Sequence, residues 1–158
     1  MLKEGLIEQL KATQHFFQTS SSVLTEADST FAPTVGMLTV AQQIAHAAQS
    51  IAWFIDGAFS PDGFDLNFEQ QMQPVLACQS LQDARQQFER AIKKAIDAIQ
   101  NASDAELMAP LPAGPIMGGA PRMAVISALA DHTAHHRGAL TVYARLLGKV
   151  PPMPYGEA

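Results

Sequence analysis

The sequence has very little cysteine and no long uninterrupted apolar run. Cys78 is the single cysteine among 158 residues, which excludes an intrachain disulfide framework and favours a reducing compartment. A membrane span needs about 18 consecutive apolar residues, and the nearest approach, 38–55, is interrupted by glutamines, a histidine and a serine. The N-terminal stretch carries acids at helical spacing and does not resemble a signal peptide. We therefore expect a cytoplasmic protein without a membrane span.

Basic residues are also scarce. Ten Lys and Arg stand against 15 Asp and Glu, which gives a formal charge of −5, and the basic residues are scattered along the chain. Domains that bind nucleic acid carry a basic face, so nucleic acid is not an expected partner. Apolar residues make up 47% of the chain, enough for the core of a single domain covering 1–158.

Apolar residues recur at helical spacing in four segments, and the loops between them are rich in proline, glycine and serine. The predicted helices cover about 2–24, Thr39 to 59, 80–101 and 121–147. Thr39 and Gln42 form a capping box at the start of the second helix, and Gly148 is typical of a helix stop. No segment alternates as a strand does. The pattern predicts an all-α four-helix bundle, with 60–74 and the proline-rich C-terminal tail outside the helices.

Three of the five histidines lie close together in the fourth predicted helix. His132 and His136 are four residues apart and fall on the apolar stripe of that helix, so both point inward. His135 falls on another face. Buried imidazoles need hydrogen-bond partners, so two satisfied core histidines are one interpretation. The spacing also allows both rings to reach a single metal ion, but two histidines supply only half of a tetrahedral site.

A third ligand has to come from another buried surface, and His46 is the candidate. It lies in the middle of the second helix, which has almost no charge, and shares its side with Gln42, Ser50 and Trp53. A core histidine bonded to a helix carbonyl is the alternative interpretation. Considered together with the His132/His136 pair, a three-histidine metal site across two helices is favoured. The remaining histidine, His15, is predicted to face solvent.

The stretch HTAHHRGAL, followed by TVYARLLGKVPPMPYG, resembles the closing signature of the DinB-like/YfiT-like metalloenzymes of bacteria. That family is damage-inducible and unrelated to the DNA polymerase of similar name. The segment QQIAHAAQSIAWF is similar to the histidine-containing segment of the same family. The first and third predicted helices carry little of this resemblance.

The resemblance implies a four-helix bundle that binds one divalent metal through His46, His132 and His136, and it implies a homodimer. Zinc or nickel suits such imidazole ligands best, and iron, cobalt, manganese or copper is also compatible. His135 matches the extra histidine of the family signature, which is not normally a ligand. It is a candidate catalytic residue only if its face lines the cleft; the alternative is a supporting position or a dimer contact.

Family members include metal-dependent thiol transferases, a thiol-dependent isomerase and hydrolases. The resemblance thus implies an enzyme acting on a small-molecule substrate, with a low-molecular-weight thiol as one possibility. The alternative is a non-catalytic metal-bound module of the bacterial stress response, with a structural or vestigial site. Ala139 occupies a position where the family commonly has Gln, and Thr133 follows His132 where a zincin has its Glu base. Both departures leave the reaction open.

Three further residues have a structural and a functional interpretation. Trp53 is a core residue or a wall of the pocket. Arg137 pairs with a carboxylate or attracts an anionic substrate. Cys78 has no neighbour in the sequence that stabilises a thiolate, so a free structural thiol is expected.

Overall fold

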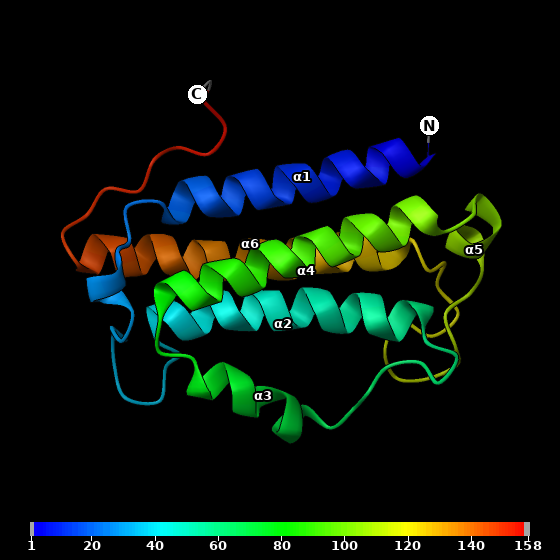
Figure 1. The fold of residues 1–158 in the computed structure, drawn as a ribbon, viewed down its shortest axis with the longest axis horizontal. Helices are drawn as coiled ribbons and strands as arrows, with labels where there is room; N and C mark the ends of the chain where they lie inside the picture. The colour runs from blue at the N-terminus through cyan, green and yellow to red at the C-terminus, as the bar shows by residue number, and fades with distance from the viewer. Residues whose placement is uncertain (1, 157–158) are drawn as a thin grey trace.

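The computed structural model describes residues 2–156, and within them all regular structure is helical apart from one β-bridge between Pro110 and Pro121 (Figure 1). The predicted all-α class is therefore confirmed for this part of the chain. The helices are α1 (Leu2–Ser21), the 3₁₀ turn η1 (Glu26–Asp28), α2 (Val40–Phe59), α3 (Phe68–Ala77), α4 (Leu81–Asn101), α5 (Asp104–Met108) and α6 (Ala124–Leu146).

The four long helices α1, α2, α4 and α6 lie side by side along the long axis of the molecule (Figure 1). α2 packs against α4 and α6, and α1 packs against the same two helices. Figure 1 shows α1 and α6 running in one direction and α2 and α4 in the other. Because α2 and α4 are parallel, the chain between them has to return along the molecule. α3 lies on that return path and packs against α2.

Small side chains fill the contact between α2 and α4. Both helices bury several alanines, and α2 and α4 are in extensive contact: Ala41, Ala45 and Ala48 of α2, and Ala84, Ala91 and Ala95 of α4. Larger aliphatic residues of α2 are buried in the same core, namely Ile44, Ile51 and Ile55. None of the described helices is long and apolar enough to cross a bilayer.

The predicted helix starts at Thr39 and Ser80 are confirmed. The Thr39 hydroxyl accepts from the Gln42 amide at 3.3 Å, and the Gln42 side chain accepts from the Thr39 amide at 2.9 Å. This reciprocal pair satisfies two amides that the first turn of α2 leaves unbonded. The Ser80 hydroxyl accepts from the Asp83 amide in the same way, at 3.2 Å, and α4 ends at Asn101.

Two predicted helix ends are wrong by a turn or less. α1 ends at Ser21 rather than at residue 24, because the carbonyls of Ser21 and Leu24 accept hydrogen bonds from the Arg85 guanidinium, each at 3.0 Å. α6 begins at Ala124 rather than at residue 121. The amides of Arg122 and Met123 donate to carbonyls of residues 109 and 107, so they are bonded to the α5 region and not into the helix.

Two short helices lie in segments that the sequence pattern assigns to loops. α3 occupies part of the predicted loop 60–74, and Asn67 caps it by accepting from the Gln70 amide at 3.2 Å. The helix accommodates Pro74 near its end and buries Val75 against the core. α5 begins with a capping box between Ser103 and Glu106, a signal that is present in the sequence. The predicted stop of the last helix is confirmed, because Gly148 adopts φ +74° after α6.

Candidate metal centre

The structure brings His46 of α2 together with His132 and His136 of α6. Each residue offers one ring nitrogen, and these three atoms lie within 4.8 Å of one another. The ring centroid of His46 is 5.2 Å from that of His132 and 4.8 Å from that of His136. The three residues that the sequence singles out for a metal site therefore form one cluster, although they are contributed by two helices far apart in the chain.

The two histidines of α6 already have the spacing of metal ligands. The Nε2 atoms of His132 and His136 are 3.3 Å apart. Two nitrogens at about 2.0–2.1 Å from a tetrahedral zinc ion are themselves separated by about 3.3 Å. Since neutral imidazole is also the commonest nitrogen ligand of first-row metals, the donors present fit a divalent ion of this class.

Burial keeps the three imidazoles neutral. Burial, together with a smaller contribution from the neighbouring histidines, lowers the pKa of His136 to about 3 and that of His132 to about 4, from an ordinary value of 6.5. Burial also lowers the pKa of His46, an effect partly offset by the side chain of Gln49. A neutral imidazole has a free lone pair for a metal, whereas an imidazolium has none, so the environment favours the form that binds.

The Nδ1 atoms of the three rings differ in their hydrogen bonding. The Nδ1 atoms of His46 and His132 are buried and have no hydrogen-bond partner among the described residues. His136 differs, because its Nδ1 lies 2.5 Å from Oε1 of Gln43 on α2. Buried polar atoms without partners are uncommon in native proteins. Two of them at one cluster indicate a site that is built for a purpose other than stability.

Gln43 and Tyr143 are the residues of this region that the sequence analysis missed. The Gln43 amide donates to the Tyr143 hydroxyl at 3.1 Å, and that hydroxyl donates to the carbonyl of Leu38 at 2.9 Å. Both side chains are buried. The sequence did carry a signal for both residues, namely polar side chains at positions expected to be buried. An amide in a nearly uncharged helix and a tyrosine on an apolar stripe both need hydrogen-bond partners once they are buried.

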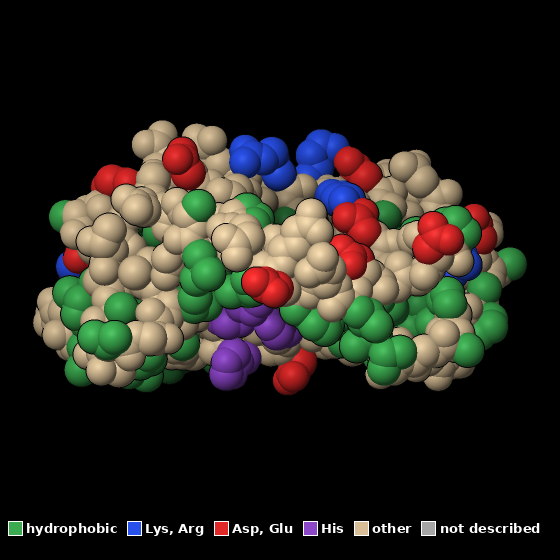
Figure 2. Space-filling model, turned by 90° about the horizontal axis from the view of Figure 1, so that it is seen from below, with side chains coloured by type: hydrophobic (Ala, Val, Ile, Leu, Met, Phe, Trp, Pro, Cys, Tyr) green, Lys and Arg blue, Asp and Glu red, His purple; other side chains and the backbone are tan. Residues whose placement is uncertain are grey.

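The cluster reaches the surface on the side of α3. Figure 2 shows histidine side chains gathered in one patch midway along the molecule, with hydrophobic side chains on both sides of it. His132 and His46 are half-buried, and only His136 is fully buried. The edge of the cluster is therefore exposed to solvent at His46 and His132.

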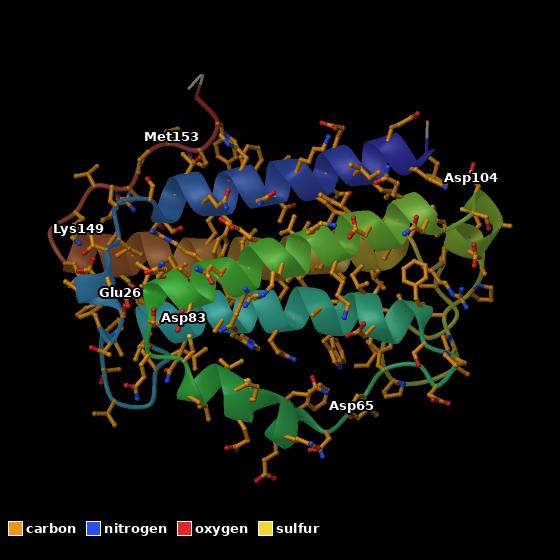
Figure 3. The ribbon with its side chains drawn as sticks, viewed as in Figure 1. Glu26, Asp65, Asp83, Asp104, Lys149 and Met153 are labelled. Atoms are coloured by element: carbon orange, nitrogen blue, oxygen red, sulfur yellow. The ribbon has the colours of Figure 1, made fainter. Side chains whose placement is uncertain are left out.

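A cleft of about 390 Å³ begins one turn of α2 away from His46. Gln49, whose side chain interacts with His46, lines it together with Trp53 and Asp56. The opposite wall comes from the connection after α2 and from α3, and Asp65 lies where the two meet (Figure 3). None of the three clustered histidines lines this cleft, which adjoins the cluster through Gln49. Another cavity, of about 250 Å³, lies beside Phe17 and Phe88 and likewise has no histidine in its lining.

Trp53 is half-buried and lies in the wall of this cleft. Its ring nitrogen donates to the carbonyl of Asp65 at 2.7 Å, and its ring packs against those of Phe64 and Phe68. Of its two interpretations, the structure therefore supports the wall of a cleft. The ring also holds the connection 60–67 against α2.

The other histidines lie outside the cluster. His15 is exposed on α1, as predicted. His135 is exposed as well, and its ring centroid is 5.0 Å from that of His136. Its ring borders the cluster without joining the group of atoms that offer metal ligands. A catalytic role for His135 stays a prediction.

Arg137 and Cys78 can also be placed. For Arg137 the sequence offers a carboxylate partner or an anionic substrate; in the structure its guanidinium donates to the Tyr155 hydroxyl at 2.8 Å and lies over the rings of Phe16 and Tyr155. The C-terminal tail supplies this partner, and its path cannot be read from the sequence pattern. Cys78 is a buried free thiol, as expected.

Taken together, these features define an all-α protein with a cluster of three histidines shared by two of its long helices. The model of the DinB family matches residues 5–158, and the chain belongs to the DinB family. The resemblance in the histidine-containing segments is thereby confirmed. None of the curated proteins matches the chain.

Proposed function

We propose that this protein is a metal-dependent enzyme of the thiol transferase or hydrolase type, in which His46, His132 and His136 hold a zinc or nickel ion. The proposal regards 1–158 as a single domain whose long helices form a four-helix bundle. Membership of the DinB family and the close approach of the three imidazoles support it. Iron, cobalt, manganese and copper remain alternative ions for the same ligands.

The number of protein ligands carries the enzyme proposal. Among residues 2–156, the cluster that offers ligand atoms has three members and no carboxylate or thiol. Structural zinc sites are normally closed by four protein ligands, whereas catalytic sites have three and leave one position for water or substrate. A three-histidine site beside a cleft is therefore the arrangement expected of a catalyst.

The bound ion would supply Lewis acidity that lowers the pKa of a coordinated water or substrate thiol toward neutrality. The protein's own residues have simpler tasks. His46, His132 and His136 provide lone pairs, and burial keeps those rings from taking up protons. Gln49 and Trp53 line the cleft where the rest of a small-molecule substrate would lie. His135 is the nearest further imidazole and is proposed as a proton-transfer candidate.

The setting of the protein is part of the same proposal. Family resemblance supports a homodimer with a role in the bacterial stress response, and the single cysteine supports a cytoplasmic location. A formal charge of −5 speaks against nucleic acid as a partner.

Metal analysis of the untagged protein tests the ligand assignment. We expect His132→Ala to lose most of the metal that the wild type retains, and His15→Ala, which removes an exposed histidine of α1, to retain it. Equal metal content in the wild type and His132→Ala would end the assignment. X-ray absorption of the loaded protein then tests the open position, because a fourth protein ligand would favour the structural module.

Turnover is tested separately, with low-molecular-weight thiols and electrophilic acceptors supplied to the loaded protein. We expect thiol consumption by wild type and His15→Ala and none by His132→Ala. Full activity in the metal-stripped wild type would contradict a metal-dependent mechanism.

A further inference from the structure

Three hydrogen bonds connect the backbone before α2 to the centre of the histidine cluster. They run from the carbonyl of Leu38 to Tyr143, from Tyr143 to Gln43, and from Gln43 to His136, with lengths of 2.9, 3.1 and 2.5 Å. We call these three side chains and the carbonyl the Leu38 relay. It links α2 to α6 across a sequence separation of about a hundred residues.

The direction of every hydrogen bond in the relay follows from its first member. The Leu38 carbonyl can only accept, so the single proton of the Tyr143 hydroxyl points to it. The hydroxyl oxygen must then accept from Gln43, and only the amide NH₂ of Gln43 can donate. The amide oxygen therefore faces His136. Because that oxygen can only accept, Nδ1 of His136 has to carry the proton.

A neutral imidazole has one proton, so a proton on Nδ1 leaves Nε2 of His136 with a free lone pair. That Nε2 atom is the one that points at His132, at 3.3 Å. In water the neutral histidine side chain prefers the opposite form, with the proton on Nε2. The relay thus imposes the less common tautomer, and this is the one whose lone pair faces the cluster.

Because the relay is buried, its polar atoms have no alternative hydrogen-bond partners in solvent. The exposed fractions of Gln43, Tyr143 and His136 are 8%, 2% and 5%, so water cannot readily replace a missing partner. A reversed tautomer would put the lone pair of Nδ1 against the Gln43 oxygen. A flipped amide would put the Gln43 oxygen against a hydroxyl with no proton to spare. Either change leaves buried polar atoms unpaired, which costs more than the bonds themselves contribute.

His132 has no equivalent support, since its Nδ1 has no partner among the described residues. In the metal-free protein its Nε2–H can donate to the bare Nε2 of His136. To act as a ligand through Nε2, His132 would have to move its proton to Nδ1. The tautomer of His136 is thus fixed before a metal binds, whereas the tautomer of His132 has to change on binding.

We propose that Gln43, oriented by Tyr143 and the Leu38 carbonyl, is a positioning residue that fixes His136 in the Nδ1–H tautomer before any metal arrives. The part of this inference that concerns metal affinity rests on the proposed function, but the tautomer does not. Metal ligands are commonly oriented in this way by a hydrogen bond from their second nitrogen. Here the Gln43 amide orients His136, and the backbone carbonyl of Leu38 fixes that amide through Tyr143.

Nitrogen-15 NMR of the metal-free protein tests the tautomer directly. We expect His136 to show a protonated Nδ1 and an unprotonated Nε2, and His132 to show the reverse. On titration with Zn²⁺, His136 should keep its proton on Nδ1 while the proton of His132 moves to that position. A protonated Nε2 on His136 in the metal-free protein would overturn the relay.

Substitutions separate the positioning role from a structural one. Gln43→Leu removes the acceptor and should weaken Zn²⁺ affinity by about 10–100-fold. Tyr143→Phe removes only the group that orients Gln43 and should weaken it by about tenfold or less. Gln43→Glu retains an acceptor for Nδ1–H, and its second oxygen can accept the Tyr143 proton at the expense of the hydrogen bond to the Leu38 carbonyl. It should therefore retain the tautomer and more of the affinity than Gln43→Leu does.

Thr133→Val is the matched control, because Thr133 is buried on α6 between the two ligands and its hydroxyl donates only to the Leu129 carbonyl. We expect this variant to bind Zn²⁺ as the wild type does. Equal affinity in Gln43→Leu and Thr133→Val would contradict the positioning role. A wild type with the expected tautomer that binds no metal would instead contradict the proposed function and leave the relay standing.

Discussion

The contact of α1 with α4 and the contact of α2 with α6 lie in the same group of helices but are built differently. In the first, the rings of Phe17 and Phe88 stack with centroids 4.3 Å apart, and both are buried. In the second, His136, Gln43 and Tyr143 place polar atoms at the same depth. Apolar contacts stabilise a fold wherever they occur, whereas buried polar groups stabilise it only if every atom is paired.

The polar contact is not fully paired. The relay satisfies one ring of the cluster, but the Nδ1 atoms of His46 and His132 have no partner among the described residues. A region selected for stability alone would carry leucine or phenylalanine at these positions. Most of the folding stability should therefore come from the apolar contact and the proposed chemistry from the polar one, and three predictions test that division.

The largest effect is expected from Phe88→Ala. Removing a buried aromatic ring leaves a cavity and should lower the free energy of unfolding by about 3–5 kcal/mol in urea denaturation. Metal content at a temperature where the variant is folded should match that of the wild type, because Phe88 belongs to α4, which contributes no histidine to the cluster. Loss of metal from the folded variant would show that the two contacts are not independent.

A smaller effect on the free energy of unfolding is expected when the pH is lowered. In the unfolded chain His132 and His136 have a pKa near 6.5, and in the folded metal-free protein burial lowers these pKa values to about 4 and about 3. Below pH 6.5 the unfolded chain therefore takes up protons that the folded protein does not. The free energy of unfolding should be constant above about pH 7.5 and fall by about 1–3 kcal/mol between pH 6.5 and pH 5, after allowance for solvent screening at half-buried His132.

Urea denaturation of the metal-free protein at several pH values measures this slope. The double variant His132→Ala/His136→Ala is the control and should lose most of it, whereas His15→Ala should retain it. The window ends at pH 5 so that aspartates and glutamates contribute little. A wild-type stability that rises toward pH 5 would mean that the imidazoles are charged in the folded protein.

The smallest effect is expected on the far side of α6, where polar contacts are exposed. Tyr155→Ala removes the hydroxyl and ring that Arg137 contacts, together with the packing of that ring on Phe16 at 5.0 Å. Because Tyr155 is largely exposed, we expect a loss of less than about 1 kcal/mol in the free energy of unfolding and no change in metal affinity. A larger loss would mean that the tail anchors α6.

The sequence predicted those parts of the fold and site that depend on local patterns. Helical spacing and capping residues identified α2 and α4, and the inward orientation of His132 and His136 followed from their place on the apolar stripe of the last predicted helix. The orientation of Gln43 was not predictable in the same way. Its partner Tyr143 is 100 residues away, and only the packed helices bring the two together.

The missed helix α3 has a similar explanation. Pro74 and the nearby Gly63 and Pro61 are typical of a loop, yet Asn67 caps a helix that tertiary contacts then stabilise. Gln42, one of those contacts, donates to the carbonyl of Leu76 at 2.8 Å. Tertiary contacts of this kind override local preference, and neither composition nor spacing records them.

The parallel course of α2 and α4 has a consequence for how this protein can change. It forces residues 60–80 to travel the length of the molecule, past the side of α2 that carries His46. The proposed ligands belong to α2 and α6, whereas the outer wall of the cleft belongs to this returning segment. Loops and short helices tolerate insertion and exchange far better than packed long helices do. Swapping residues 60–80 between relatives would therefore change which molecules enter the cleft and leave the proposed metal ligands in place.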